Sequence, residues 1–219
     1  MSERVGIGWF SGGVTSAVAI KKVLDAGHKL QLYYFETGAH HSDHTRFITD
    51  CEAWYGQKIH IIQNQKYGHL HDVLKTGHIN GPKGARCTKL LKKDMRIALE
   101  KIVSFDFQVF GFEYEKKEIN RAIRFEEQYP EAKAVFPLIE LNLNKSQAMQ
   151  ILQAANIELP MMYKLGYSNS NCIGCVKGGK GYWNKIRQDF PQVFNDVAKI
   201  EREVGRSCIK GQYLDTMPS

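Results

Sequence analysis

The feature that most constrains this chain is the alternation of short apolar runs with amphipathic helical patterns along its first two thirds. Five apolar runs are predicted to be strands, at 5–10, 29–35, 58–62, 107–112 and 134–138. Helical patterns are predicted at 14–24, 42–55 and 88–102, and a long loop with one helical turn at 64–86. Because strands that alternate with helices favour a parallel sheet, we predict an α/β fold with a five-stranded parallel sheet and helices on both faces.

The chain has 219 residues, a length that suits one domain with an appendage, or at most two small domains. We expect residues 1–142 to form a nucleotide-binding α/β core. Residues 143–219 are expected to form a C-terminal helical extension that contains cysteines.

The first predicted strand runs directly into the first helix through Ser11-Gly12-Gly13. The two glycines permit positive φ and let an anion approach the backbone, and the helix start offers free N–H groups. Thr15 and Ser16 add hydroxyl donors. A tight turn capped by Ser11 would have the same residues, so the stretch by itself leaves both interpretations open. It is not a Walker loop, because no Lys-Ser/Thr pair follows the glycines.

Polar features fall at the ends of other predicted strands as well. Glu36-Thr37-Gly38 follows the second strand, and Gly111-Phe112-Glu113 lies at the end of the fourth. Cys87 lies in the loop before the third helix. Ligands of open α/β sheets bind beyond the carboxyl ends of the strands, so this convergence favours a phosphate site over a plain turn. We expect Glu36, Thr37 and Gly38 to form a wall beside the ribose or adenine.

Three of these stretches, SGGVTS, FETG and GFEYEKKEINRAIRF, together resemble the PP-loop, or adenine nucleotide alpha hydrolase, superfamily. Within it the chain is most similar to the phosphoadenosine phosphosulfate (PAPS) reductase-like family. PLIELNLNKSQAMQIL, IELPMMYKLGY and NCIGCVKGGKGYWNKIRQDFP continue the resemblance, which covers about residues 5–205.

The resemblance implies a PP-loop (HUP-like) sheet whose first corner holds the phosphates of ATP or another adenine nucleotide. The residues implied to bind the nucleotide are Ser11, Gly12, Gly13, Thr15, Ser16, Gly111 and Glu113. Arg121 is implied to clamp a phosphate or sulfate, although an exposed helix arginine would look the same. Many relatives carry Asp where this chain has Thr15, and a carboxylate there would help to hold Mg²⁺. The departure therefore leaves the use of Mg²⁺ open.

The five cysteines carry a second signal. Cys172 and Cys175 have the C-x-x-C spacing of a metal site, a buried pair or a redox dithiol. Cys87 begins a predicted helix, whose positive end is expected to lower the pKa of its thiol, so it is our predicted catalytic cysteine together with Arg121. Cys51 is expected to be an ordinary core residue, and Cys208 lies near the C-terminus.

Relatives with sulfur chemistry often bind a 4Fe–4S cluster through three cysteines, and Cys87, Cys172 and Cys175 fit that pattern. We therefore predict that these three hold one metal centre, with Zn²⁺ as the alternative to the cluster. A four-thiolate site would also need Cys208.

The remaining composition sets limits on partners and compartment. The formal charge of +7 favours polyanionic partners, either nucleotides or nucleic acid, and cations alternate with aromatics from Lys177 to Arg187. The histidines, among them His40 and His44, are interpreted as solvated loop residues. An odd number of cysteines without a signal-type N-terminus, and no long apolar run, predict a cytoplasmic protein without a membrane span.

Three functions follow from these observations. The first is ATP-dependent, adenylating sulfur transfer, with a nucleic-acid acceptor and a sulfur-donor protein as candidate partners. The second is a sulfonucleotide (PAPS or APS) reductase, against which the Glu-Cys-Gly-Leu-His signature of those reductases is absent. The third is a non-catalytic nucleotide- or nucleic-acid-binding module with structural zinc.

Overall fold

The computed structural model describes residues 4–81 and 84–218. Positions 82 and 83 of the predicted long loop lie outside the described residues. None of the helices formed by the described part of the chain is long and apolar enough to cross a membrane.

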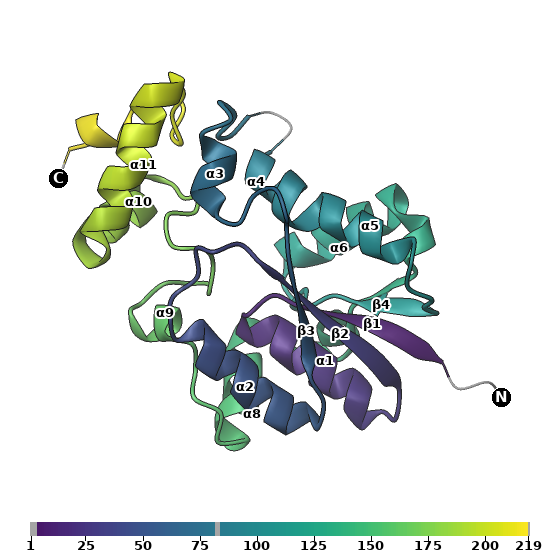
Figure 1. The fold of residues 1–219 in the computed structure, drawn as a ribbon. Coiled ribbons are helices and arrows are strands. Elements are labelled where there is room, and N and C mark those ends of the chain that lie inside the picture. Colours follow the sequence, from purple (N-terminus) through teal and green to yellow (C-terminus); the bar gives the residue numbers. More distant parts are fainter. Residues whose placement is uncertain (1–3, 82–83, 219) are drawn as a thin grey trace. The chain divides into compact units, whose positions relative to one another are not determined.

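The centre of the fold is a five-stranded sheet in the order β3-β2-β1-β4-β5 (Figure 1). The strands are β1 (Val5–Phe10), β2 (Lys29–Glu36), β3 (Ile59–Gln63), β4 (Phe107–Val109) and β5 (Ala134–Val135). β1 pairs in parallel with both β2 and β4, and β4 pairs in parallel with β5. The predicted parallel α/β sheet is confirmed.

The helices of the first half are α1 (Val14–Asp25), α2 (His44–Tyr55), α3 (Leu70–Leu74), α4 (Arg86–Thr88), α5 (Asp94–Glu100) and α6 (Lys116–Gln128). Those of the second half are α7 (Pro137–Glu140), α8 (Lys145–Ala154), α9 (Met161–Lys164), α10 (Lys180–Asp189) and α11 (Pro191–Val204). A π-helical segment, Lys89–Lys93, joins α4 to α5, so the single helix predicted at 88–102 is interrupted.

Each face of the sheet has its own apolar layer. α1, α2 and α8 cover one face in Figure 1, and the apolar side of α1 is buried there with Leu32, Leu138 and Leu152. On the other side, α6 contributes Ala122 to a cluster with Phe112 and Phe136.

Two predicted strands are shorter than their apolar runs. β5 ends at Val135, because Pro137 occupies the first turn of α7, where its fixed φ favours a helix start. β4 ends at Val109, and Phe110 and Phe112 instead pack with α6. Apolar residues alone could not show this change, since both environments bury them.

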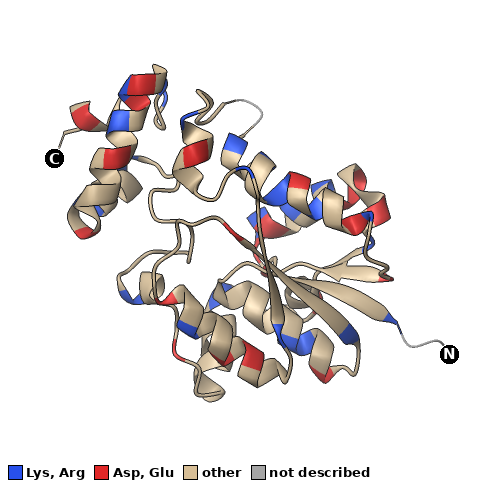
Figure 2. Ribbon diagram, in the orientation of Figure 1, with Lys and Arg blue, Asp and Glu red and all other residues tan. Residues whose placement is uncertain are grey.

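By packing, the chain forms two compact units that interleave along the sequence. The sheet unit comprises residues 1–34, 42–62 and 103–170, and the cysteine unit comprises 35–41, 63–102 and 171–219. The predicted boundary after residue 142 stays a prediction. Lys and Arg are spread over helices of both units rather than gathered in one tail (Figure 2).

A buried polar pair joins the central strand β1 to its neighbour β4. The indole Nε1 of Trp9 on β1 donates to Gln108 Oε1 on β4 at 2.7 Å, and Gln108 is completely buried. A leucine at this position would take away the acceptor while the indole N–H stays inside the protein. Removing one partner of a buried hydrogen bond destabilises a protein more than replacing both partners with apolar groups, because the remaining polar group stays buried without a partner.

We therefore expect Gln108→Leu to lower the free energy of unfolding by about 1–3 kcal/mol in urea denaturation. Gln128→Leu, at an exposed position near the end of α6, serves as the control and should change it by less than about 0.5 kcal/mol. Equal stability of the two variants would show that the Trp9–Gln108 pair contributes nothing net.

Candidate functional site

The corner between β1 and α1 is held together by its own hydroxyls. Ser16 Oγ accepts from the backbone N–H of Ser11 at 3.0 Å and donates to the Gly13 carbonyl at 2.9 Å. The Ser11 hydroxyl lies 2.9 Å from Ser16 Oγ. Ser16 is therefore buried and fully used in shaping the loop, whereas Ser11 is exposed and Thr15 half-buried.

Glycine is required at two positions around this corner for reasons of space. Gly12 has φ +77°, and a Cβ there would lie 1.8 Å from the His44 ring. A Cβ on Gly111 would lie 2.6 Å from the backbone nitrogen of Ser16. Gly13, by contrast, has an ordinary φ of −108° and could hold a Cβ. The described residues provide no hydrogen-bond partner for the backbone N–H groups of Gly12, Gly13 and Thr15, so these donors suit an anion.

A buried carboxylate follows β4 in the same unit. Glu113 is 8% exposed, and its Oε1 lies 3.3 Å from the Lys145 ammonium at the start of α8. Lys145 also donates to Asn169 Oδ1 at 3.0 Å. Sequence reasoning missed Lys145, because its position in KSQAMQIL is typical of any helix start.

Arg121, the predicted clamp, lies on α6 with an exposed side chain. Its Nη1 donates to Glu118 at 3.0 Å, and its guanidinium lies 4.2 Å from the centre of the Phe112 ring. The planar cation is therefore supported from one side by an aromatic face, and its role toward a ligand stays a prediction.

The cysteine unit contains a second polar cluster, built around Cys172. The Cys172 thiol lies 3.1 Å from the Thr37 hydroxyl and 3.9 Å from His40 Nε2. The other ring nitrogen of His40 lies 3.6 Å from Glu36 Oε1. Glu36 also accepts from the backbone N–H groups of Thr37 and Gly38, at 2.7 and 2.6 Å. The chain Glu36–His40–Cys172 thus orients an imidazole toward a thiol.

This arrangement changes the ionisation of the thiol. Burial raises the pKa of Cys172, but hydrogen bonding to His40 and the positive charge of Lys92 outweigh it and lower the pKa to about 6. The hydrogen bond to His40 lowers the pKa of Glu36 to about 2. Although burial lowers the pKa of His40, its contacts with Cys172 and Glu36 raise it on balance. At neutral pH the cluster therefore contains the Cys172 thiolate beside the His40 ring, whose own pKa is raised.

The other four cysteines remain protonated thiols. Burial, followed by the charges of Cys172 and Cys175, raises the pKa of Cys87, so the expected lowering at a helix start is wrong. Burial also raises the pKa of Cys175, and it raises that of Cys51 to about 12. Burial and the carboxylate of Glu201 raise the pKa of Cys208 far above its usual range. Among the described cysteines, only Cys172 has a lowered pKa, and the catalytic role predicted for Cys87 stays a prediction.

The predicted metal ligands come together in part. Cys87, Cys172 and Cys175 belong to one unit, their charges influence one another, and all five cysteines are free. Among the residues that the structure describes, however, no three His, Cys, Asp or Glu side chains are arranged to hold one metal ion. The donor set fits a soft metal or cluster in its chemistry but not in its present spacing.

The aromatic residues that follow the C-x-x-C pair have structural roles. The Tyr182 hydroxyl accepts from the backbone N–H of Cys175 at 2.8 Å and donates to the Cys172 carbonyl at 3.1 Å. Trp183 is fully buried. The Trp183 ring is therefore not available to stack on a base, and the Tyr182 hydroxyl is used to hold the C-x-x-C loop.

Sequence reasoning was wrong about two histidines. The His40 side chain is only 4% exposed and His44 is 6% exposed, so neither is a solvated loop residue. The spacing Glu36-x-x-x-His40 is a signal that could have suggested the pair, but only the fold brings Cys172 to the ring.

The ionised Cys172 generates a prediction about reactivity. In reduced, metal-free protein, the alkylation of Cys172 by iodoacetamide should reach half its maximum rate at a pH of about 6. Cys87 and Cys175 should stay slow up to their higher pKa values, because only the thiolate reacts. Peptide mass spectrometry after timed quenching measures each site.

His40→Ala should raise the midpoint for Cys172 and slow its alkylation at pH 7 by at least about tenfold, since each pKa unit changes the thiolate fraction tenfold. His78→Ala, at an exposed position, is the matched control and should leave the profile unchanged. A Cys172 profile that does not move in His40→Ala would contradict the assigned pair.

Comparisons with known proteins agree with the motifs. A family model described as the phosphoadenosine phosphosulfate reductase domain matches residues 7–179. No curated protein sequence matches the chain.

Two solved structures are similar in fold. One is phosphoadenylyl-sulfate (PAPS) reductase from Candida auris in its phosphate complex, with 14% identity, a TM-score of 0.54, and coverage of 76% of this chain and 80% of that one. The other is the U34-tRNA thiolase NcsA from Methanococcus maripaludis with its 4Fe-4S cluster, with 15% identity, a TM-score of 0.50, and coverage of 100% and 80%. At such identities the likeness establishes the fold alone. The family model spans most of the chain, including the corner after β1 and the C-x-x-C pair, and this chain therefore belongs to the phosphoadenosine phosphosulfate reductase domain family.

Proposed function

We propose that this chain is an adenine-nucleotide-binding enzyme that carries out ATP-dependent sulfur transfer. The observation that carries the proposal is the Cys172 thiol, which lies 3.1 Å from the Thr37 hydroxyl and 3.9 Å from His40 Nε2 and shares its unit with two further thiols, Cys87 and Cys175. A thiolate beside an imidazole can accept or deliver sulfur, whereas a purely structural cysteine pair needs no such activation.

The two similar structures lend support from different directions. One is a PAPS reductase holding phosphate, and the other is a tRNA thiolase holding a 4Fe-4S cluster. Both chemistries join a nucleotide site to sulfur. The thiolase supports a nucleic-acid acceptor for this chain, and a sulfur-donor protein would supply the sulfur.

The proposed phosphate site is the corner after β1. The free N–H groups of Gly12, Gly13 and Thr15 face the phosphates, Thr15 adds its hydroxyl, and Ser11 and Ser16 maintain the loop. Gly111 lets the segment after β4 pass close to the backbone of Ser16, and Glu113 follows two residues later in the same segment. The contribution of Glu36, Thr37 and Gly38 to nucleotide binding stays a prediction, as does the phosphate clamp by Arg121.

The proposed sulfur centre is formed by Cys87, Cys172 and Cys175. When bound to them, an iron–sulfur cluster would supply an iron without a protein ligand, which could hold sulfide. Zn²⁺ would instead only crosslink the three cysteines. The chain's own contribution is the thiolate of Cys172, which His40 and Thr37 stabilise. Cys208 is buried and its backbone N–H donates to Glu201, so it is not part of the proposed ligand set.

The proposed reaction has two balanced steps. An oxygen of the acceptor attacks the α-phosphate of ATP, a P–O bond forms, and pyrophosphate leaves. A sulfur nucleophile then attacks the carbon that carries the activated oxygen, and AMP leaves with that oxygen. Because Thr15 replaces a carboxylate found in many relatives, the requirement for Mg²⁺ in the first step is left to experiment.

Product analysis separates this proposal from its alternatives. Anaerobic protein incubated with ATP and candidate acceptors should release pyrophosphate. Sulfite from PAPS would instead indicate a sulfonucleotide reductase. Neither product, together with tightly bound zinc, would indicate a non-catalytic binding module.

The corner generates a prediction on nucleotide binding. Gly13→Val places two methyl groups beside the phosphate donors, next to the Tyr163 hydroxyl, which lies 3.3 Å from a Cβ at this position. The variant should lose ATP binding in calorimetry by at least about tenfold while unfolding cooperatively. Gly181→Val, where a Cβ meets nothing within 4 Å, is the control. Unchanged affinity in Gly13→Val would remove the corner from the proposed site.

The cysteines generate a prediction on metal content. After anaerobic purification, Cys87→Ser, Cys172→Ser and Cys175→Ser should each lose the bound metal, as measured by elemental analysis and absorption spectra. Cys51→Ser and Cys208→Ser should retain it, because both thiols are buried and neither belongs to the proposed ligand set. Loss of metal in Cys208→Ser would favour a four-thiolate zinc site.

A further inference from the structure

The α9 helix places a tyrosine hydroxyl at the proposed phosphate corner. The backbone N–H of Val14, the first residue of α1, donates to the Tyr163 hydroxyl at 3.4 Å. The backbone of Ser170 also hydrogen-bonds to this oxygen. A Cβ added to Gly13 would lie 3.3 Å from the same hydroxyl. All of these residues belong to the sheet unit.

The hydrogen bonds of this hydroxyl leave its proton unused. Its oxygen accepts from backbone N–H groups, and the described residues offer no acceptor for its O–H. Burial raises the pKa of Tyr163, so the side chain stays neutral and remains a donor at physiological pH. A donor without an acceptor, next to the free N–H groups of a helix start, is suited to an anionic oxygen.

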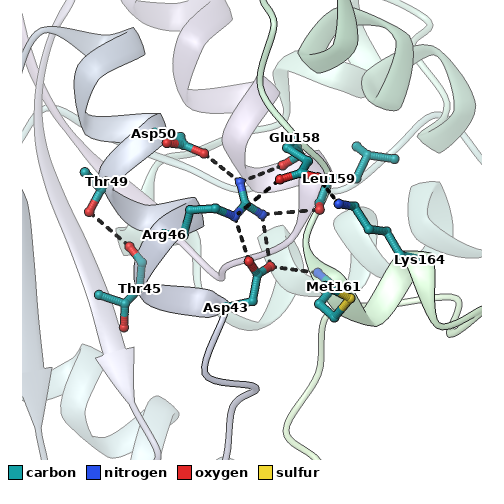
Figure 3. A network of polar contacts seen from close by, with 9 residues as sticks. All are labelled: Asp43, Thr45, Arg46, Thr49, Asp50, Glu158, Leu159, Met161 and Lys164. Carbon is teal, nitrogen blue, oxygen red and sulfur yellow. Dashed lines mark hydrogen bonds and ion pairs between the residues drawn. The ribbon is translucent and has the colours of Figure 1, made fainter.

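A network of ion pairs sets the position of α9. The Asp43 carboxylate accepts from the backbone N–H of Met161, the first residue of α9, at 2.8 Å. Arg46 binds both oxygens of Asp43, at 2.6 and 2.9 Å, and also donates to the Leu159 carbonyl at 3.3 Å and the Glu158 carbonyl at 3.1 Å (Figure 3). These bonds connect the start of α2 to the segment that leads into α9. The last contact, at Met161, lies two residues before Tyr163.

We propose that Tyr163 is a further phosphate-binding residue of the corner, and that Arg46 is the residue that positions it. The Tyr163 O–H donates to an oxygen of the tetrahedral anion held at Gly12 and Gly13, either a nucleotide phosphate or the sulfate of a sulfonucleotide. The inference rests on the proposed function, which puts a nucleotide at this corner.

The first experiment compares two tyrosines that each bind the backbone of α1. Tyr163→Phe removes the hydroxyl at the helix start, and Tyr55→Phe removes a hydroxyl that donates to the Ala17 carbonyl at 2.9 Å, one turn further along. Calorimetry with ATP, and separately with adenylyl sulfate, should show a loss of affinity of about tenfold or more in Tyr163→Phe. Tyr55→Phe should bind as the wild type does, and thermal unfolding checks that both variants are folded.

The second experiment tests the positioning role through a double-mutant cycle. Arg46→Lys keeps the charge but loses the two-pronged bond to Asp43, so it should weaken ATP binding when Tyr163 is present. In the Tyr163→Phe background the same change should have no further effect on affinity. An equal loss in both backgrounds would show that Arg46 does not act through Tyr163.

The outcomes separate this inference from the function on which it rests. If the wild type binds neither ATP nor adenylyl sulfate, the proposed nucleotide site falls and this inference with it. If the wild type binds and Tyr163→Phe binds equally well, only the role of Tyr163 is overturned. A loss with both nucleotides assigns the contact to the α-phosphate that they share. A loss with ATP alone assigns it to the β- or γ-phosphate, and a loss with adenylyl sulfate alone assigns it to the sulfate.

Discussion

The parallel pairing of β1 with β2 and β4 is the constraint on which the rest of the structure depends. Parallel strands end at the same edge of a sheet, so the segments that follow Phe10, Glu36 and Val109 all begin there. Each of these segments contains glycine together with polar residues. The sheet thereby concentrates the chemistry of the chain in its connections, while the strands themselves supply the core.

In the corner after β1, some groups hold the loop in shape and others are free to bind a ligand. The Ser16 hydroxyl is spent on Ser11 and Gly13, so it fixes the loop instead of facing a ligand. Gly12 is glycine because His44 packs against it, and Gly111 because the backbone of Ser16 passes it. What remains free is a set of N–H groups, and a loop stiffened in this way presents them without reorganisation.

A similar division holds among the cysteines of the chain. Five cysteines of one chemical type are separated by their surroundings into one thiolate and four thiols. Desolvation raises the pKa of all five thiols. Lysine charges oppose it at Cys87, Cys172 and Cys175, but only at Cys172 does a hydrogen bond to an imidazole add enough to outweigh it. The buried Glu201 works in the opposite sense, since it binds the backbone of Cys208 and Leu214 and keeps the Cys208 thiol protonated.

Local patterns were sufficient for the sheet, the first corner and the family. Apolar runs that alternate with helical periodicity determine strand order along the chain, and glycines with hydroxyls mark the corner, because both depend on neighbours in sequence. Only the tertiary structure decided which cysteine is ionised, since the partner of Cys172 is His40, 132 residues away. The same holds for Tyr163, whose hydroxyl meets Val14 across 149 residues. A pKa and a donor's direction are set by what surrounds a group in space, and a sequence pattern contains no such information.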